Sequence, residues 1–373
     1  MAERRSSPVE LLWDLVFVFA VTQVSTLLRD DLTWAGLGRA MLLLALVWWA
    51  WSAYVWVLNA HDPEQPAVRA ILLGAGGLIF IAGLALPRAY HGEGTLFAVT
   101  YVLVRLAHLG LYADVSRRGS AAWSAIAGFA ITVAVGMGLL LAGSFLHGGL
   151  RVGLWVAAAA IDYAGPAWLT RERLRGLQRV AVEHFAERYG LFIIICLGES
   201  VVAIGFGAQG HALDARLLVA ASLTLLITAE LWWTYFTRFA AIAQESLARA
   251  NDPVLAAADG YSYLHLLLVA GVIVFAVGAR VEVAHGGGRL SDPARLALCG
   301  GVALYLLGGV AFRARLVGAV GWVKLAAALG CLVVYSVSGS APAWVPAALL
   351  ATVLAALLVW EQRRELPRDL ARA

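Results

Sequence analysis

One apolar stretch of the chain, residues 182–205, carries His184, Glu187, Arg188 and Glu199, whose side chains could do chemistry. On a helix with about 100° per residue, His184, Arg188 and Glu199 lie within about 60° of one another. Arg188 and Glu199 are about 16 Å apart along the axis, so they share a face without touching. A carboxylate near the membrane midplane is costly unless it is paired, hydrated or protonated. Glu199 is therefore a candidate proton- or ion-coupling site.

A structural interpretation of the same residues stays open. Glu199 could be a protonated hydrogen-bond donor that holds two helices together beside Gly198 and Ser200. His184, Glu187 and Arg188 stand where this helix would enter the membrane. An interfacial role there, by snorkelling or in a gating salt bridge, competes with a chemical one.

The first apolar run poses a similar question with Glu10 and Asp14, which are four residues apart and therefore share a helix face. We expect Glu10 to be solvated at the membrane edge and Asp14, about one turn further in, to need a partner. Arg105 is the first candidate because a mid-span arginine normally faces protein or water rather than lipid. The sequence does not choose between an Asp14–Arg105 pair and a Glu199–Arg105 pair.

Three further polar residues, Asp162, Glu230 and His265, interrupt other apolar runs. We interpret His265 first as a satisfied core histidine and keep it as a polar-site candidate. In the same span Gly271 and Gly278 predict a close approach of a neighbouring helix.

These polar residues stand in a chain whose composition fits a membrane protein. Of its 373 residues, 61% are hydrophobic and only 14% are charged. Soluble domains carry about 25% charged residues. The fourteen Trp and eleven Tyr residues fit the aromatic belts at membrane interfaces. The net charge of +4 is spread over short loops, so we expect no nucleic acid as a partner.

The positions of the apolar runs predict an all-α polytopic protein with about twelve transmembrane helices. Lys and Arg residues outside the runs are more frequent on the side that carries the N-terminus, which predicts that both termini are cytoplasmic. The predicted spans are 10–28, 37–58, 68–87, 94–113, 121–142, 150–168, 186–207, 215–238, 259–280, 294–312, 317–338 and 342–360.

Parts of the first half of the chain resemble parts of the second. The run that starts at Val9 matches the run that starts at Val182, and Trp48-Trp49 matches Trp232-Trp233. We predict one integral membrane domain, 1–373, built from two six-helix repeats, 8–170 and 180–361. Such halves would be parallel and related by an axis along the membrane normal.

Three motifs make the chain similar to the bacterial low temperature requirement A (LtrA) family. They are "ELLWDLVFVFAVTQVS" at 10–25, "HFAERYGLFIIICLGESVV" at 184–202 and "YSYLHLLLVAGVIVFAVG" at 261–278. The family usually has Phe-Phe where this chain has Leu12-Trp13, and His-Pro where it has His265-Leu266. The resemblance implies a multi-pass protein of the bacterial cytoplasmic (inner) membrane, linked by name to growth in the cold. It supplies no substrate. It points to seven polar positions: Glu10, Asp14, His184, Glu187, Arg188, Glu199 and His265.

The leading hypothesis is a proton- or ion-coupled permease for an unknown small solute or ion. The lipid bilayer is its expected partner, and a homo-oligomer is compatible with the sequence. We expect no cofactor. No Walker motif is present that would let ATP drive it. One alternative is a membrane-embedded metal-dependent enzyme that uses His184, Glu187, Glu199 and His265, although no His-Glu-x-x-His pattern supports it. The other alternative is a structural or lipid-sensing protein. We favour a protein that is not an enzyme, with no catalytic residue and no metal ligand assigned.

Overall fold

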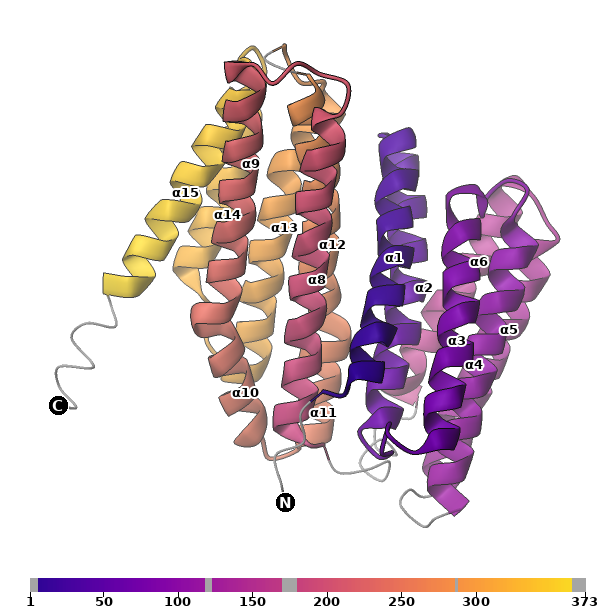
Figure 1. Cartoon of the computed structure of the whole chain (residues 1–373). Coiled ribbons are helices and arrows are strands. Elements are labelled where there is room, and N and C mark those ends of the chain that lie inside the picture. The colour runs from indigo at the N-terminus through magenta and orange to yellow at the C-terminus, as the bar shows by residue number, and fades with distance from the viewer. Residues whose placement is uncertain (1–5, 118–122, 170–179, 286–287, 364–373) are drawn as a thin grey trace, which may run out of the picture. The chain divides into compact units, whose positions relative to one another are not determined.

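The structure is a computed structural model that describes residues 6–117, 123–169, 180–285 and 288–363. Every regular element within these ranges is a helix (Figure 1). Ten of the helices in the described ranges are long and apolar enough to cross a membrane. The predicted class, an all-α polytopic membrane protein, is therefore confirmed.

Helices occupy all twelve predicted spans, but two of these helices are short. The predicted span 150–168 corresponds to α6 (Gly148–Ala164), which has 17 residues and continues into a π-helical segment, η2 (Gly165–Leu169). The predicted span 317–338 corresponds to α14 (Trp322–Val337), which has 16 residues. The predicted start of span 121–142 lies outside the described residues. The number of complete crossings therefore stays a prediction.

One of two compact units comprises Met1–Ile195 and Ser246–Leu266. Within it α1 packs against α2 and α3, and α4 packs against α3 and α5 (Figure 1). Helix α6 packs against α5 and α2. Besides α6 and η2, the unit contains α1 (Pro8–Asp30), α2 (Trp34–Leu58), α3 (Pro66–Ala85), η1 (Leu86–Arg88), α4 (Gly94–Arg117), α5 (Trp123–Ser144), the first half of α8 (Val182–Ala208), α11 (Pro253–Ala257) and the π-helical segment η4 (Ala258–Leu264).

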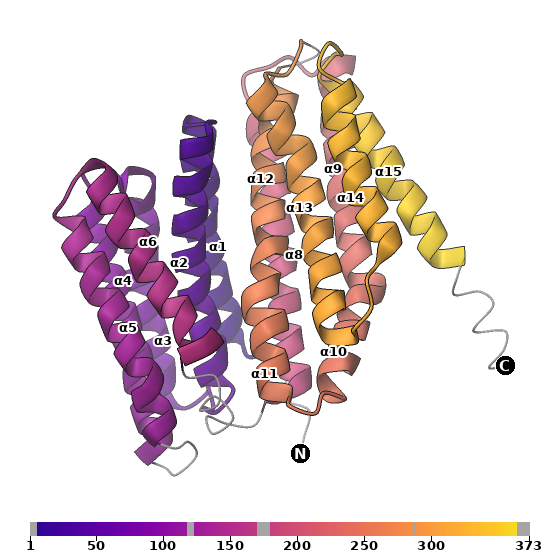
Figure 2. The ribbon, with the colours of Figure 1, turned by 180° about the vertical axis from the view of Figure 1, so that it is seen from behind.

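The other unit comprises Cys196–Glu245 and Leu267–Ala373. Here α13 packs against α14, and α15 packs against α9 and α14. Figure 2 shows α12 and α13 side by side along their lengths. Besides α14 and the second half of α8, the unit contains α9 (Ala215–Thr234), the π-helical segment η3 (Tyr235–Phe239), most of α10 (Ala240–Ala248), most of α12 (His265–Ala284), α13 (Asp292–Val317) and α15 (Trp344–Arg363).

The repeat halves 8–170 and 180–361 stay a prediction. The first compact unit combines Met1–Ile195 with Ser246–Leu266, whereas both segments of the second unit come after residue 195. Residue 170, the predicted end of the first half, lies outside the described residues.

The side chains are distributed as a bilayer requires. Large apolar residues such as Leu73, Ile131, Leu226 and Val333 are exposed on the helix surfaces. Charged residues such as Arg188, by contrast, are buried. Exposed apolar faces of this extent would drive a soluble protein to aggregate, whereas lipid tails match them.

Close contact between α12 and α13 depends on glycine, as the sequence predicted for Gly271 and Gly278. A methyl group on Gly271 would lie 2.8 Å from the carbonyl oxygen of Gly301. One on Gly301 would overlap the backbone nitrogen of Phe275. Backbone atoms cannot move aside as the end of a side chain can, so glycine is needed where the two helices meet.

Replacing Gly301 by alanine should destabilise the protein by about 1–3 kcal/mol, because α12 and α13 would have to separate. The measurement is the thermal unfolding of purified protein in detergent. Gly300→Ala is the matched control on the same helix, because its methyl group would meet only the side chain of Leu296 at 3.4 Å. Equal melting temperatures for the two variants would refute the close-packing argument.

Candidate functional site

Glu10 is fixed at the start of α1 by a capping box. Ser7 accepts a hydrogen bond from the backbone nitrogen of Glu10, and Glu10 Oε2 accepts one from the backbone nitrogen of Ser7 at 2.9 Å. Pro8 occupies the first turn, where its missing N–H is not needed. The prediction that Glu10 is solvated is wrong, because its side chain is 0% exposed. The cap and the partners described next take the place of water.

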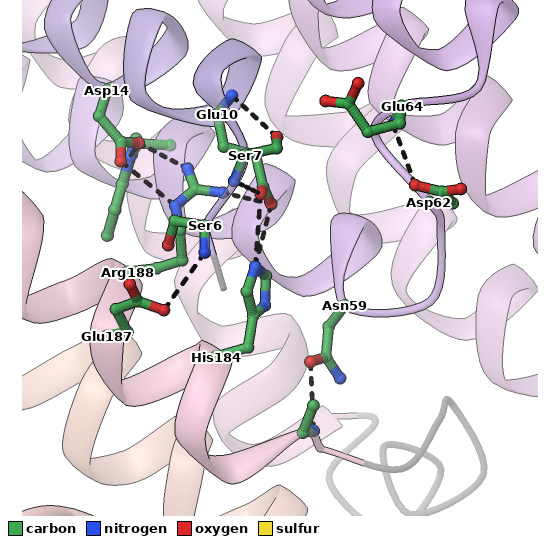
Figure 3. A network of polar contacts seen from close by, with 12 residues as sticks. Ser6, Ser7, Glu10, Asp14, Asn59, Asp62, Glu64, His184, Glu187 and Arg188 are labelled. Atoms are coloured by element: carbon green, nitrogen blue, oxygen red, sulfur yellow. Dashed lines mark hydrogen bonds and ion pairs between the residues drawn. The ribbon is translucent and has the colours of Figure 1, made fainter. Parts of the chain in front are cut away.

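Arg188 of α8 lies between the two carboxylates of α1 (Figure 3). Its Nη1 donates to Glu10 Oε1 at 2.8 Å. Its Nη2 and Nε donate to the two oxygens of Asp14 at 2.5 and 3.2 Å. None of the three side chains is exposed. One guanidinium therefore holds two carboxylates in a fork geometry that a lysine could not reproduce.

His184 completes this group one turn before Arg188. Its Nε2 lies 3.2 Å from Glu10 Oε1, and the residue is buried. We call Glu10, Asp14, His184 and Arg188 the buried ion cluster. Two carboxylates face one guanidinium, so the cluster carries one excess negative charge while His184 is neutral. A single proton, on His184 or on a carboxyl group, balances the cluster.

Further hydrogen bonds on α2 and α8 involve Trp51, which contacts the cluster, and the sequence neighbours of Trp51 and Arg188. Trp51 Nε1 donates to Asp14 Oδ1 at 2.8 Å. The next residue on α2, Ser52, lies 2.8 Å from the hydroxyl of Tyr189, which follows Arg188 on α8. Ser52 also donates to Ser262 of η4 at 2.9 Å. The residue types alone did not indicate these hydrogen bonds, because tryptophan, tyrosine and serine are common in membrane helices.

Arg105 does not pair with Asp14, one of the two partners that the sequence left open for it. Its Nη2 donates to both carboxylate oxygens of Asp162 on α6, at 2.9 and 3.0 Å. Asp14 is held by Arg188 and Trp51 instead. The sequence could have indicated the Arg105–Asp162 pair, because Asp162, like Arg105, interrupts an apolar run and needs a partner of opposite charge.

A cavity lies beside the Arg105–Asp162 pair within the same unit. The centre of a water-sized sphere can move through about 70 Å³ of it. A single water needs about 10–15 Å³ measured in this way, so several waters or a small solute fit. The wall is formed by Trp49, Ser52, Ala53, Trp56, Arg105, His108, Tyr112, Phe129, Thr132, Val133, Asp162, Pro166, Ala258, Ser262 and Tyr263.

Arg105 keeps unused hydrogen-bonding capacity at this cavity. It is 1% exposed, and its Nε and Nη1 have no hydrogen-bond partner among the described residues. Arg151, another buried arginine of this unit, donates to four backbone carbonyls instead. An unpaired buried donor is unfavourable until an acceptor reaches it. The cavity is therefore suited to a small group that carries oxygen acceptors or negative charge.

The sequence of the chain matches a known family over nearly its full length. The pattern described as "Bacterial low temperature requirement A protein (LtrA)" matches residues 5–359. The chain belongs to the LtrA family. An uncharacterized protein of Rhizobium meliloti (strain 1021) is 33% identical over 315 residues, which cover 82% of this chain and 76% of that protein. No solved structure shows a significant match.

Two of the three LtrA motifs come together in the structure to form the buried ion cluster. The motifs at 10–25 and 184–202 supply the whole buried ion cluster. The third motif, at 261–278, contributes no member of the cluster. It contains Ser262, which bonds to Ser52, and His265, whose Nδ1 lies 3.3 Å from the carbonyl oxygen of Gly260. His265 is fully buried and stacks on Tyr261, as a core histidine would.

Two of the remaining candidates lie elsewhere in this LtrA chain. Glu187 is exposed, and its Oε2 accepts a hydrogen bond from the backbone nitrogen of Ser6 at 3.3 Å. Glu199 is 8% exposed and belongs to the second unit, whereas the buried ion cluster belongs to the first. A coupling role of Glu199 stays a prediction.

The metal-ligand set considered for an enzyme finds no support in the described residues. No group of three or more His, Cys, Asp or Glu side chains is placed to hold a metal ion in those ranges. His184 faces Glu10, whereas Glu187, one turn later, contacts Ser6.

Proposed function

We propose that this LtrA protein is a proton-coupled permease that moves a small anion together with a proton. The observation that carries the proposal is the buried ion cluster, in which two carboxylates share one guanidinium beside a histidine, so that one added proton would balance the carboxylate charges. Burying an uncompensated charge costs several kcal/mol, so the cluster binds a proton readily when no other cation is near.

The path from the cluster to the cavity supports coupling between proton and solute. Trp51 bonds to Asp14, and its neighbour Ser52 lines the cavity. Arg188 holds the carboxylates, and its neighbour Tyr189 bonds to Ser52 and Ser262 at the cavity wall. A shift of α1 or α8 on protonation therefore changes the groups that a solute meets.

The cavity supports an anionic solute of small size. The free N–H groups of Arg105 supply hydrogen bonds, and Trp49, Trp56 and Tyr263 supply apolar walls. One proton taken up with one monovalent anion leaves the net charge of the unit unchanged. Transport is then electroneutral and does not depend on the membrane potential.

The membrane location and orientation of this permease are inferred from its sequence. It resides in the bacterial cytoplasmic membrane with both termini in the cytoplasm, because that orientation puts the excess of Lys and Arg inside. Its two predicted six-helix halves, related by an axis along the membrane normal, fit a transporter plan. Neither point identifies the solute.

Purified protein in liposomes that contain a pH-sensitive dye should acidify the interior when a suitable external anion is added. Chloride, nitrate, methanesulfonate and glycolate form a first panel. Glu10→Gln should reduce the rate to that of protein-free liposomes, because Asp14 and Arg188 alone are already balanced. Dissipating the membrane potential should leave the wild-type rate unchanged.

Glu187→Gln is the matched control for this experiment. It removes an exposed carboxylate from α8 that is not a member of the buried ion cluster, so its rate should equal that of the wild type. Glu199→Gln in the same assay tests the coupling role predicted from the sequence. Acidification with none of the four anions, or full activity of Glu10→Gln, would overturn the proposed function.

A further inference from the structure

A second and larger cavity lies within the other unit, where several helices end together. A left-handed glycine, Gly318 (φ +71°), terminates α13, and α14 begins at Trp322. This short turn places the end of α13 and the start of α14 at one end of the unit. The centre of a water-sized sphere can move through about 310 Å³ of this cavity. Its wall comprises Arg238, Phe239, Ile242, Ala243, Gly309, Phe312, Arg313, Val317, Val320, Gly321, Trp322, Val323, Lys324, Trp360 and Glu361.

The charges of this wall are strongly unbalanced. Three cationic side chains, Arg238, Arg313 and Lys324, face a single carboxylate, Glu361. Lys324 Nζ is 3.8 Å from Glu361 Oε1, and the two side chains are 13% and 17% exposed. The wall therefore contains more cations than carboxylates; Lys324 and Glu361 are largely buried there, and Arg238 and Arg313 are partly exposed. A negatively charged ligand fits this set of side chains.

Arg313 also offers an unused donor to such a ligand. Its Nε is buried and has no hydrogen-bond partner among the described residues. A guanidinium with a free edge suits the oxygens of a phosphate group, which accept hydrogen bonds in the same fork geometry as a carboxylate.

The apolar part of the wall indicates where the phosphate would come from. Phe239 and Phe312 line the cavity, and Lys324 Nζ lies 5.5 Å from the centre of the Phe239 ring. Trp322 is exposed at the start of α14, and tryptophan favours the level of lipid headgroups. The Lys and Arg distribution predicts that this end faces the cytoplasmic leaflet, where anionic lipids bind basic pockets between helices.

We propose that the cavity formed by Arg238, Arg313 and Lys324 at the junction of η3, α13, α14 and α15 binds a phosphate group, supplied by an anionic membrane lipid. The positive side chains hold the phosphate oxygens, and the aromatic residues contact the glycerol and the first part of the acyl chains. This site is independent of the proposed proton coupling, because it uses none of the residues of the buried ion cluster or the Arg105 cavity.

Thermal unfolding of delipidated protein in detergent tests the site. Added phosphatidylglycerol should raise the melting temperature, because a ligand that binds the folded state stabilises it, whereas phosphatidylcholine should not. The double variant Arg313→Gln/Lys324→Gln should lose the shift. Arg315→Gln should keep it, because this exposed arginine lies on the same helix but does not line the cavity.

Two further measurements fix the interpretation. Inorganic phosphate is the second probe. If it raises the melting temperature less than phosphatidylglycerol does, the result supports a lipid ligand. If it raises the melting temperature equally and the double variant loses this effect, the site binds free phosphate. If the double variant does not fold, Lys324→Gln alone takes its place, with mass spectrometry of co-purified lipid as the readout. The proposal is overturned if neither probe shifts the wild type, or if the cavity variants retain the full shift.

Discussion

Replacing Arg188 by methionine should reduce the stability of the folded protein by about 3–5 kcal/mol, because a buried pair loses one partner. Glu10 and Asp14 are both 0% exposed and would be left as adjacent carboxylates without a counter-charge. Arg188→Lys should fall between the methionine variant and the wild type, since one ammonium group cannot donate in parallel to two carboxylates. The measurements are the folded yield by size-exclusion chromatography and the thermal unfolding in detergent.

Two comparisons separate loss of charge balance from loss of a long side chain. Arg216→Met on α9 removes an exposed arginine and should change the stability by less than about 0.5 kcal/mol. Adding Glu10→Gln and Asp14→Asn to Arg188→Met should restore much of the stability, because no buried charge then lacks a partner. An Arg188→Met protein as stable as Arg216→Met would contradict the ion-pair argument.

Replacing Asp162 by leucine should have an effect of similar size at the second buried pair, again about 3–5 kcal/mol. Arg105 is 1% exposed, and Asp162 is the carboxylate that it contacts. The loss of folded protein on heating measures the effect. Adding Arg105→Met should recover most of the stability, since apolar residues of similar volume can replace a buried pair.

Asp30→Ala is the control for this pair. Arg29 and Asp30 are 2.6 Å apart, closer than the 2.9 Å of Arg105 and Asp162, but their side chains are 30% and 59% exposed. A surface pair contributes about 0–1 kcal/mol. Burial rather than distance should therefore decide the size of the effect. Equal losses for Asp30→Ala and Asp162→Leu would refute this expectation.

The doubly substituted Arg105→Met/Asp162→Leu protein also bears on function. It should be folded and should keep the buried ion cluster, but its cavity would lack the free N–H groups of Arg105. We therefore expect it to be inactive in the liposome assay. A stable but inactive protein distinguishes a role in binding the anion from a role in folding.

The helix face shared by residues close in sequence was predicted well, but the residues that they contact on other helices were not. The spacing of His184 and Arg188 correctly placed them on one face of α8. It could not show that this face meets α1, because Arg188 and Glu10 are separated by 178 positions. The same limit explains why the sequence could not choose a partner for Arg105. Asp14 and Asp162 are equally suitable partners by chemistry, and helix packing decides which one Arg105 contacts.

The sequence alone determined the membrane class, the all-helical fold, the family and the polar residues that a bilayer makes costly. It did so because hydrocarbon constrains composition and helix length wherever each helix lies. Only the tertiary structure decided that Glu10 is buried and that one arginine holds two carboxylates. It also decided that Arg105 and Arg313 have donors beside cavities with no acceptor among the described residues. These features depend on side chains from different helices converging, and the distances between helices are set by packing rather than by spacing along the chain.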